Sequence, residues 1–496
     1  MTNIWTTKKT TTGLRPAAPR IRTEFVPEAP KAKPLPSKEK EVRALAARQR
    51  YDKPAGASSA TKRQHAISSS ATPKRLGVKR KPSRQTSPAN PFSHDDDSSD
   101  DAADVGSPAS YEKRQRRDMN TLDDPNRQIC SRKAFAKESN LRMIHAADIQ
   151  EDGHKSKYAV TGKVADAMAV ELQYPSLVQR ERYKLILAND NIDPFKEIIS
   201  IAEIVAEVYL TPEEAKSFLD PDVGCIRMLT RAKNLSSAAP EDFVQAVEKY
   251  NRDILSLVRD GSIATNLQSM HHIPYNLVKR ILSQAYDRTV SPKVELLSKY
   301  KNGTDEVYGE LLAPLVHQLL AEVELKSDQV FVDLGSGVGN VVLQAALEFG
   351  CESWGCEMMQ NAYELANAQK KEFQARCRLW GIAPGEVHLE SANFLENKPI
   401  YEAMKRADVI LINNHVFTPQ TNRSLVDLFL DLKDGCKIIS MKNFVPDDHV
   451  MKRNSNDPVN ILDVMKKGYY YSDSVSWTEL PGQYFIARKR SMIELA

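Results

Sequence analysis

Apolar residues follow three different patterns along this chain of 496 residues. In residues 1–130 they have no period, and Pro, Ser, Ala, Lys and Arg dominate. Such a segment cannot bury enough apolar surface to offset its conformational entropy, so we predict a disordered arm. Apolar positions recur at helical spacing in residues 157–304, and short apolar runs alternate with helical stretches in residues 305–496. The pattern predicts a small helical domain followed by an α/β domain.

In the middle region we expect helices at 199–210, 243–258 and 277–285. Thr211 and Pro212, followed by two glutamates, form the cap and first turn of another helix. In the last region we expect strands at 329–334, 352–357, 386–390, 408–413, 437–440 and 484–488. Their alternation with helices favours a mainly parallel sheet covered on both faces, with its ligand at the carboxyl ends of the strands.

The strand at 329–334 ends in a glycine turn formed by Gly335, Gly337 and Gly339. Glycine adopts positive φ readily and lets a ligand approach the backbone closely. A helix follows from Val341, and its free N–H groups face whatever lies over the turn. The spacing is Asp-x-Gly-x-Gly-x-Gly, whereas dinucleotide-binding turns have Gly-x-Gly-x-x-Gly and hold a pyrophosphate. A nucleoside without phosphate is therefore the better candidate.

Two acids indicate which nucleoside. Asp333 ends the strand before the glycine turn and can receive an ammonium group. Glu357 stands 18 residues after Gly339, at the end of the next expected strand, where an acid holds ribose hydroxyls. S-adenosylmethionine, an adenosine with an amino-acid tail, suits both acids. The alternative is that the turn is only a tight connection between strand and helix.

Polar and aromatic residues follow the next expected strands. Phe394 can lie against the adenine, and Asn393 can accept from its amino group. The amide oxygen of Asn413 can orient an incoming amine, and Phe417 can form a wall of the slot. An asparagine pair at this point can also simply make a turn.

Trp477 and Tyr484 offer an indole and a phenol to a substrate channel, or they are core residues. Methyl transfer requires the attacking amine to be neutral and aligned with the sulfur–methyl bond. An apolar channel lowers the pKa of a lysine amine, and aromatic walls suit its alkyl stem and a cationic product. We therefore expect neither a dedicated base nor a metal.

The net charge of +4 hides an asymmetry. Residues 1–90 contain 21 Lys and Arg against 5 Asp and Glu, a net of +16, so residues 91–496 carry −12. This division predicts a basic arm that binds a polyanion. Clusters at 74–75 and 79–81 read as a nuclear-import signal, a phosphate-contacting patch or a merely solvated charge run. An acidic block at 95–104 follows, and it either folds back on the arm or touches a basic partner.

Six scattered cysteines without a Cys-x-x-Cys pair argue for a reducing compartment and against a structural zinc site. We expect them to be small core hydrophobes. No apolar run is long enough for a transmembrane helix, and the N-terminus lacks the apolar region of a signal peptide.

Several segments together resemble the disruptor-of-telomeric-silencing (Dot-one) family, the histone H3 lysine methyltransferases that lack a SET domain. The resemblance covers residues 240–490. The segments that carry it are Lys249-Tyr250-Asn251-Arg252, Ile281-Leu282-Ser283-Gln284-Ala285-Tyr286, Val307-Tyr308-Gly309-Glu310, the glycine turn, Ile412-Asn413-Asn414-His415-Val416-Phe417-Thr418-Pro419, Ser440-Met441-Lys442-Asn443-Phe444 and Ser474-Val475-Ser476-Trp477-Thr478. Many methyltransferases share the glycine turn, whereas the asparagine–phenylalanine segment together with Ser-Val-Ser-Trp-Thr is far more specific.

The resemblance implies a class I S-adenosylmethionine-dependent methyltransferase, Rossmann-like, with a mainly parallel seven-stranded sheet. It implies a nuclear enzyme that methylates a lysine in the globular core of histone H3 on nucleosomes. Chromatin regulation, telomeric silencing and the DNA-damage response are its implied settings. Implied partners are nucleosomal DNA, through the basic arm, and ubiquitylated histone H2B.

The resemblance also assigns residues. Cofactor contact falls on Tyr308, Gly309, Glu310, Leu311, Phe331, Val332, Asp333, Leu334, Gly335, Ser336, Gly337, Val338, Gly339, Asn340, Glu357, Asn393 and Phe394. Asn413 falls beside the transferred methyl group, and Phe417, Trp477 and Tyr484 fall around the lysine channel.

Three positions depart from the family pattern. Asn393 stands where an Asp is common, which weakens one adenine contact, and Leu311 replaces a hydroxyl residue. His415 stands where an aromatic such as Phe is expected; it is a packed histidine or a residue that tunes access of the lysine with pH. Two other functions stay open: an amino-group methyltransferase for nucleic acid, and a chromatin adaptor without turnover. The intact Asp333 and Asn413 count against the adaptor.

Overall fold

The structure is a computed structural model that describes residues 92, 123–150, 169–185, 192–235, 240–298, 309–449 and 456–491. All of them belong to one compact unit, Ser83–Ala496. The predicted disorder of residues 1–122 and the acidic block at 95–104 lie outside the described residues, apart from Phe92.

The middle region is mostly helical, as the pattern predicts. Helices α3 (Arg132–Phe135) and α4 (Ala146–Gln150) precede it, and its own helices are α5 (Pro194–Val208), α6 (Pro212–Leu219), α7 (Cys225–Leu235), α8 (Pro240–Arg259), α9 (Ser262–Gln268), α10 (Tyr275–Thr289) and the 3₁₀ helix η1 (Ser291–Ser298). The predicted cap is present: the Thr211 hydroxyl accepts from the Glu214 amide, and the Glu214 carboxylate accepts from the Thr211 amide.

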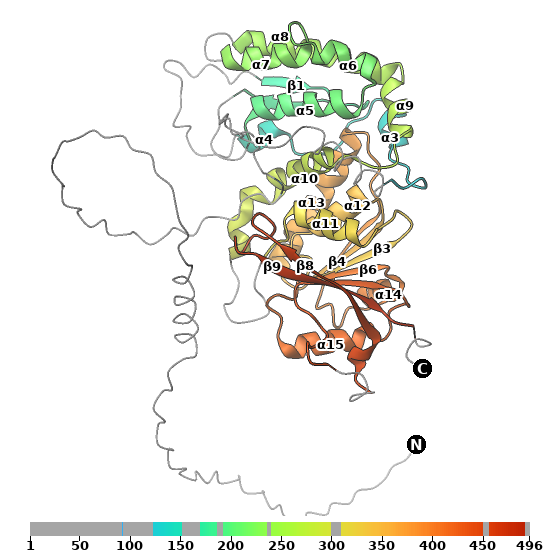
Figure 1. Ribbon diagram of the computed structural model, residues 1–496. Coiled ribbons are helices and arrows are strands. Elements are labelled where there is room, and N and C mark those ends of the chain that lie inside the picture. Colours follow the sequence, from blue (N-terminus) through green and yellow to red (C-terminus); the bar gives the residue numbers. More distant parts are fainter. Residues whose placement is uncertain are drawn as a thin grey trace, which may run out of the picture. The chain divides into compact units, whose positions relative to one another are not determined.

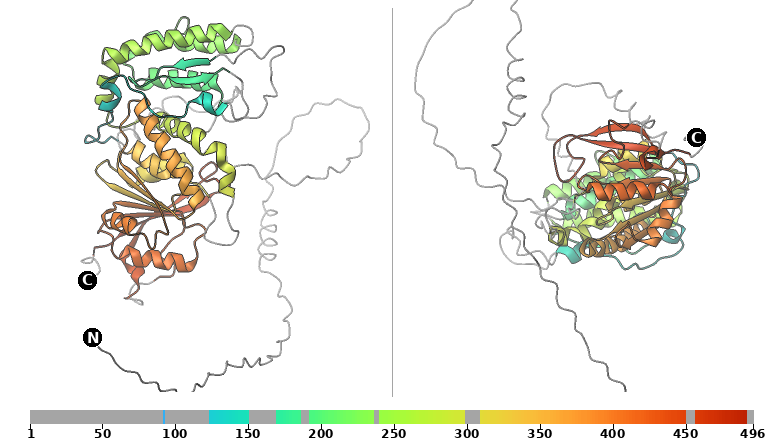
Figure 2. Two further views of the ribbon diagram at one scale, coloured as in Figure 1. Left: turned by 180° about the vertical axis from the view of Figure 1, so that it is seen from behind. Right: turned by 90° about the horizontal axis from the view of Figure 1, so that it is seen from below.

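A hairpin of two short strands, β1 (Ala169–Leu172) and β2 (Glu181–Lys184), was not predicted in this region. It lies against α8 (Figures 1 and 2). The Asn251 side chain joins the two elements, since its Oδ1 accepts from the Gln173 amide at 2.7 Å and its Nδ2 donates to the Glu171 carbonyl at 2.7 Å. The buried positions of β2 are Glu181 and Tyr183, and a buried charged residue interrupts the alternation of apolar and polar positions that would predict a strand.

The C-terminal region contains a seven-stranded sheet in the order β5-β4-β3-β6-β7-β9-β8. Its elements are α11 (Ala313–Glu322), β3 (Val330–Leu334), α12 (Asn340–Glu348), β4 (Glu352–Glu357), α13 (Gln360–Leu379), β5 (Val387–Ser391), α14 (Lys398–Arg406), β6 (Val409–Ile412), α15 (Pro419–Phe429), β7 (Lys437–Ser440), η2 (Pro458–Ile461), β8 (Leu462–Tyr470) and β9 (Gly482–Lys489). The first five strands of the order are parallel, and β9 and β8 complete the sheet in antiparallel register. This confirms the predicted mainly parallel α/β fold.

Side chains of the central strands alternate between two apolar layers. Phe331 and Leu411 pack in the layer of α11 and α12, whereas Val332 and Ile410 pack in that of α14 and α15. Figure 1 shows these helix pairs on opposite faces of the sheet. After β3 the chain runs to β4 and β5 on one side, and later to β6 and β7 on the other. Such a reversal of strand order opens a crevice at the carboxyl ends of the strands.

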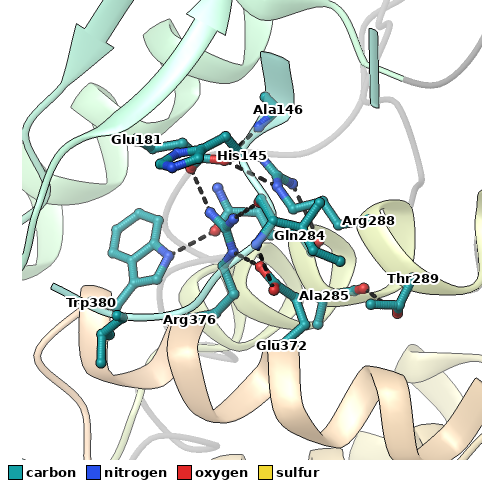
Figure 3. A network of polar contacts seen from close by, with 12 residues as sticks. His145, Ala146, Glu181, Gln284, Ala285, Arg288, Thr289, Glu372, Arg376 and Trp380 are labelled. Carbon is teal, nitrogen blue, oxygen red and sulfur yellow. Dashed lines mark hydrogen bonds and ion pairs between the residues drawn. The ribbon is translucent and has the colours of Figure 1, made fainter. Parts of the chain in front are cut away.

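A buried network of charges joins the middle region to the sheet domain. The Glu181 carboxylate in β2 accepts from Arg288 of α10 at 2.8 Å and from Arg376 of α13 (Figure 3). Arg376 also pairs with Glu372 one turn earlier, at 2.7 Å. All four side chains are buried. One continuous apolar cluster likewise contains residues of both regions. Because these contacts do not separate the two regions, the domain boundary at residue 304 stays a prediction.

Residues 123–130, which we predicted to be part of the arm, pack on the sheet domain. The Asp124 carboxylate accepts from the amide and hydroxyl of Ser327 at 2.8 and 2.7 Å. The Arg127 guanidinium donates to the carbonyls of Leu347 and Glu348 at the C-terminus of α12. Polar residues that satisfy buried partners leave no apolar period in the sequence, so the pattern did not indicate this packing, and the boundary at 130 stays a prediction.

The structure records no disulfide among the six cysteines, and five of them are buried. None of the helices in the described part of the chain combines the length and the apolar character needed to cross a bilayer.

Candidate functional site

The glycine turn leaves the centre of the sheet between β3 and α12. Gly335, Gly337 and Gly339 have φ of +88°, +54° and +85°, as predicted from their spacing. The amides of Gly335 and Ser336 both donate to the Cys356 carbonyl at 3.0 Å, which holds the turn against β4. A Cβ atom at Gly335 would meet only the Phe417 ring, at 3.8 Å. The space over this glycine therefore belongs to a cavity, and any side chain there would enter it.

The cavity has a volume of about 340 Å³ and lies where the sequence placed the ligand. It is lined by Gly309, Glu310, Leu311, Asp333, Gly335, Ser336, Gly337, Val338, Asn340, Val341, Glu357, Met358, Met359, Phe394, Leu411, Asn413, His415, Val416, Phe417 and Trp477. Volumes of this order are typical of small-molecule sites.

Asp333 and Glu357 lie on the same side of the cavity. Burial, with Glu357 adding to it, raises the pKa of the Asp333 carboxyl to about 8. Burial also raises the pKa of Glu357, although its carboxylate accepts from the amides of Gly337 and Met359 at 2.9 and 2.7 Å. Two acids so close in a buried cavity favour a cation beside them. Asp333 is therefore well placed to hold a ligand ammonium.

A short segment with Gly309, Glu310 and Leu311 forms another wall, and it is held by the Ser-Val-Ser-Trp-Thr segment. The Glu310 amide donates to the Ser476 hydroxyl at 2.8 Å, and the Ser476 amide donates to the Glu310 carbonyl at 2.9 Å. Trp477 covers Gly309 so closely that a Cβ atom there would be 2.7 Å from the indole ring. Glycine is therefore the residue that this contact allows.

Glu310 connects this wall to the glycine turn. Its Oε1 accepts from the Asn340 side chain at 3.2 Å, and the Asn340 Oδ1 accepts in turn from Gln369 of α13 at 2.8 Å. Asn340 is the first residue of α12, and no side chain caps that helix. The arrangement fixes the position of the helix N-terminus beside the cavity.

Asn413 and the aromatic residues form the remaining wall. The Asn413 Nδ2 donates to the Gly309 carbonyl at 3.2 Å. Within the described part of the chain, the buried Asn413 Oδ1 and the buried Trp477 Nε1 have no hydrogen-bond partner. Phe394 stacks on Phe417 with ring centroids 5.9 Å apart. The cavity thus combines apolar rings with a donor and an acceptor that have no protein partner among the described residues and that a ligand can satisfy.

His415 also lines the cavity, although our site assignment left it out. Its ring lies 5.4 Å from the Trp477 ring, and partial burial together with Lys442 lowers its pKa. The sequence had singled out His415 only as a departure from a pattern. Met358 and Met359 line the cavity as well, and their place directly after the strand-end acid Glu357 was the signal that could have found them.

Several assigned residues lie elsewhere. Phe331, Val332 and Leu334 are buried strand residues that support the turn from within the sheet, and Gly339 faces Ala366 and Leu389. The Asn393 Oδ1 accepts from the Leu395 amide at 3.1 Å, so it serves the local turn. None of these residues is part of the cavity wall. Tyr308 lies outside the described residues.

Tyr484 does not line the cavity, and its assignment to the lysine channel stays a prediction. It lies in β9, and its hydroxyl donates to the Glu322 carboxylate of α11 at 2.7 Å and accepts from Gln318 at 3.0 Å. Burial and this carboxylate raise its pKa. A tyrosine that follows the Ser-Val-Ser-Trp-Thr segment was expected near Trp477, but strand β9 carries its side chain into the layer of α11.

Comparison with known proteins identifies the family. Residues 286–488 match the family described as histone methylation protein DOT1. A protein of Gibberella zeae is 49% identical over 429 residues, 85% of this chain and 86% of the relative. One of Aspergillus fumigatus is 47% identical over 424 residues, 84% of this chain and 83% of the relative. Both are named "Histone-lysine N-methyltransferase, H3 lysine-79 specific". The chain belongs to the DOT1 family.

The family match begins at Tyr286 in α10 and includes every residue that lines the cavity. The relatives extend the similarity well beyond the catalytic region, since 85% of the chain is covered. A crystal structure of an RNA methyltransferase from Salinibacter ruber with S-adenosyl-L-homocysteine has 18% identity, covers 36% of this chain and 92% of its own, and has a TM-score of 0.25. A score this low supports no conclusion about this member of the DOT1 family.

The residues of this DOT1 family cavity fit S-adenosylmethionine. The open space over Gly335 leaves room for a ligand beside the backbone, and the buried Asp333 suits its ammonium. The described residues include no group of three or more His, Cys, Asp or Glu that could hold a metal ion.

Proposed function

We propose that this chain transfers methyl groups from S-adenosylmethionine to the ε-amine of a lysine in the globular core of histone H3. The names of its relatives give this residue as lysine 79. The observation that carries the proposal is one cavity that combines a glycine turn and two acids with a buried, unsatisfied amide oxygen between aromatic rings. The acids suit the cofactor, and the amide and rings suit an amine.

On this proposal the cavity side chains divide between the two ligands. Asp333 holds the ammonium of the cofactor, Glu357 the ribose hydroxyls, and Phe394 lies against the adenine. The bound cofactor supplies an electrophilic methyl group on a sulfonium. Gly335 leaves the room that the cofactor needs, since a Cβ there would have open space around it.

Asn413 positions the amine. Its Nδ2 is committed to the Gly309 carbonyl, so its Oδ1 is the atom free to accept an N–H bond. An amine that donates there keeps its lone pair for the methyl group, and holding the reacting atoms in line accounts for much of the rate. Phe417, Trp477 and His415 exclude water, which lowers the lysine pKa and favours the neutral amine.

The partner proposed for the arm is nucleosomal DNA. Residues 1–90 carry a net charge of +16, and such segments bind phosphates in a salt-dependent manner. Ubiquitylated histone H2B and a nuclear location follow from the family resemblance and complete the proposal.

The test is radiolabelled methyl transfer by the full-length chain onto nucleosomes, free histone octamer and bare DNA in parallel. Nucleosomes with and without ubiquitylated H2B are compared. We expect label on nucleosomal H3, located by mass spectrometry at lysine 79, and more of it with ubiquitylated H2B. Label on DNA with none on H3 would instead support the nucleic-acid methyltransferase.

The arm is tested by deleting residues 1–82. The deletion ends there because Phe92 and residues 123–130 pack on the folded body. We expect weaker nucleosome binding and a smaller dependence of affinity on salt, with unchanged cofactor affinity, because each phosphate contact contributes about −0.9 to the slope of log K against log salt. An unchanged slope would contradict DNA binding by the arm.

A further inference from the structure

One residue of the N-terminal arm is buried in the folded body. The Phe92 side chain is only 4% exposed and belongs to the same apolar cluster as α10. Its ring meets the Tyr286 ring edge to face, with centroids 6.0 Å apart and an interplanar angle of 75°. This geometry is the favourable one for two aromatic rings. The contact is therefore specific in position and orientation.

Tyr286 connects this contact to the cofactor cavity. It is fully buried in α10, and burial together with nearby Glu310 raises its pKa. Glu310 lines the cavity and accepts from Asn340, the first residue of α12. Helix α10 also packs against α12, so the ring of Phe92 rests on a helix that contacts the helix whose first residue lines the cavity.

The position of Phe92 in the sequence is also informative. The 21 Lys and Arg of residues 1–90 end just before it, and the acidic block begins at Asp95. Phe92 therefore marks the boundary between the basic and acidic segments. The next described residue is Asp123, so without this contact 30 further residues would separate the basic segment from the folded body.

We propose that Phe92 is an anchor that docks onto Tyr286 of α10 and so attaches the basic segment to the folded body through a short length of chain. The proposal rests on the proposed function for the nature of the polyanion, which is nucleosomal DNA. A short connection raises the effective concentration of a bound nucleosome at the folded body, and this gain falls as the connecting chain lengthens. The anchor thus couples phosphate binding by the arm to methyl transfer.

The experiment compares the full-length chain with Phe92→Ala and with Phe25→Ala, which removes the same ring from the basic segment itself. Hydrogen exchange of residues 275–289 reports on the contact, and nucleosome KM and kcat report on its use. We expect Phe92→Ala to accelerate exchange in α10 and to raise KM on the order of tenfold with little change in kcat. Phe25→Ala should leave α10 exchange unchanged.

The same substitution in the chain lacking residues 1–82 separates anchoring from folding. If Phe92 acts through the arm, Phe92→Ala should no longer change KM once the basic segment is gone. An equal rise in KM in both backgrounds would show a general effect on the fold and overturn the proposal, as would unchanged exchange in α10. If the wild-type chain does not methylate nucleosomes, the proposed function fails, whereas the exchange result still decides whether the anchor exists.

Discussion

The side chain of Asn413 donates from Nδ2 to the Gly309 carbonyl at 3.2 Å, and this bond leaves its Oδ1 buried without a partner among the described residues. An unsatisfied buried acceptor costs about 1–3 kcal/mol of stability. Because Asn413 lines the cavity, a donor group of a bound ligand can reach this oxygen. The neighbouring Asn414 differs, since both its amide atoms are bonded, to Asn422 and to the Lys442 backbone.

We therefore predict opposite effects of two alanine substitutions. Asn413→Ala should lower kcat for nucleosome methylation by about 100-fold, because the amine is no longer aligned, with little loss of thermal stability. Asn414→Ala should lower the melting temperature, because it leaves three backbone or side-chain partners unsatisfied. Melting curves and single-turnover rates measure both. Full activity of Asn413→Ala would remove this residue from the mechanism.

A side chain at Gly335 should abolish cofactor binding without unfolding the protein. Gly335→Arg fills the cavity, since its Cβ would meet only Phe417 at 3.8 Å. Gly435 is a matched control, because its φ of +82° is close to the +88° of Gly335 and a Cβ there would meet nothing within 4 Å. Both arginine variants should lose about 1–2 kcal/mol for the left-handed backbone. Calorimetric titration with the cofactor should show binding only for Gly435→Arg.

Cofactor affinity should rise with pH below about 8. The pKa of Asp333 in the empty protein is about 8, so the carboxyl must lose its proton before it can receive an ammonium. Between pH 5.5 and 7.5 the association constant should increase, approaching about tenfold per pH unit, the limit for one linked proton. Asp333→Asn should bind weakly with a flatter profile. Glu357 shares the direction of this shift, so Glu357→Gln is the necessary comparison.

The same raised pKa affects stability with the opposite sign. A carboxyl that holds its proton more tightly when folded stabilises the fold below its unfolded pKa, and this contribution is lost as pH rises through about 8. The cofactor-free protein should therefore unfold at lower urea at pH 8 than at pH 6, and Asp333→Asn should reduce the difference. An identical difference in the variant would show that Asp333 is not its source.

Glu181 should be among the most sensitive positions for stability. Its carboxylate is the shared partner of the buried Arg288 and Arg376. Glu181→Gln removes the charge that Arg288 and Arg376 share and leaves each of them one carboxylate, that of Glu197 or Glu372. Breaking a buried ion pair costs about 3–5 kcal/mol. Glu171→Gln, on the paired strand but exposed, should change stability by less than about 0.5 kcal/mol. Urea unfolding followed by circular dichroism measures both.

His415 should make methyl transfer sensitive to mild acid. It lies 5.4 Å from Trp477 in the cavity wall, and burial and Lys442 keep its pKa below the usual value, so it is neutral at pH 7. Protonation would place a cation beside the incoming amine. At pH values below 6, the activity of the wild-type chain should decrease relative to that of His415→Phe. His388→Phe is the control, because the His388 ring stacks on Trp354 with ring centroids 4.1 Å apart and does not line the cavity. The ratio of wild-type to His388→Phe activity should stay at one.

The order of strands and helices around the glycine turn follows from the sequence. Buried parallel strands are continuous apolar runs, and the positive φ values of the turn demand glycine at those positions. The strand β8 and the hairpin β1–β2 were missed for a physical reason. β8 lies at the edge of the sheet with Met465, Lys466 and Lys467 exposed, so burial imposes no alternation on it.

Some residues of the cavity wall were likewise predictable from the sequence, and others were not. Asp333, Glu357 and Asn413 were predictable because the carboxyl ends of parallel strands meet at one edge. Other features depend on contacts between segments that are distant in the sequence. They are the hydrogen bond of Glu310 with Ser476, the ring contact of His415 with Trp477 and the hydrogen bond of Tyr484 with Glu322. The periodicity of apolar residues indicates which residues are buried, but it does not indicate which residues they pack against.

The α/β order, the glycine turn with its two acids and the difference in charge between residues 1–90 and the rest were all predictable from the residue pattern, because backbone preferences, burial and charge are recorded along the chain. The folded chain was needed to show which side chains share the cavity, that Glu181 joins two distant helices and that Phe92 lies on Tyr286. These contacts join residues far apart along the chain, and their free energy depends on packing that no local pattern records.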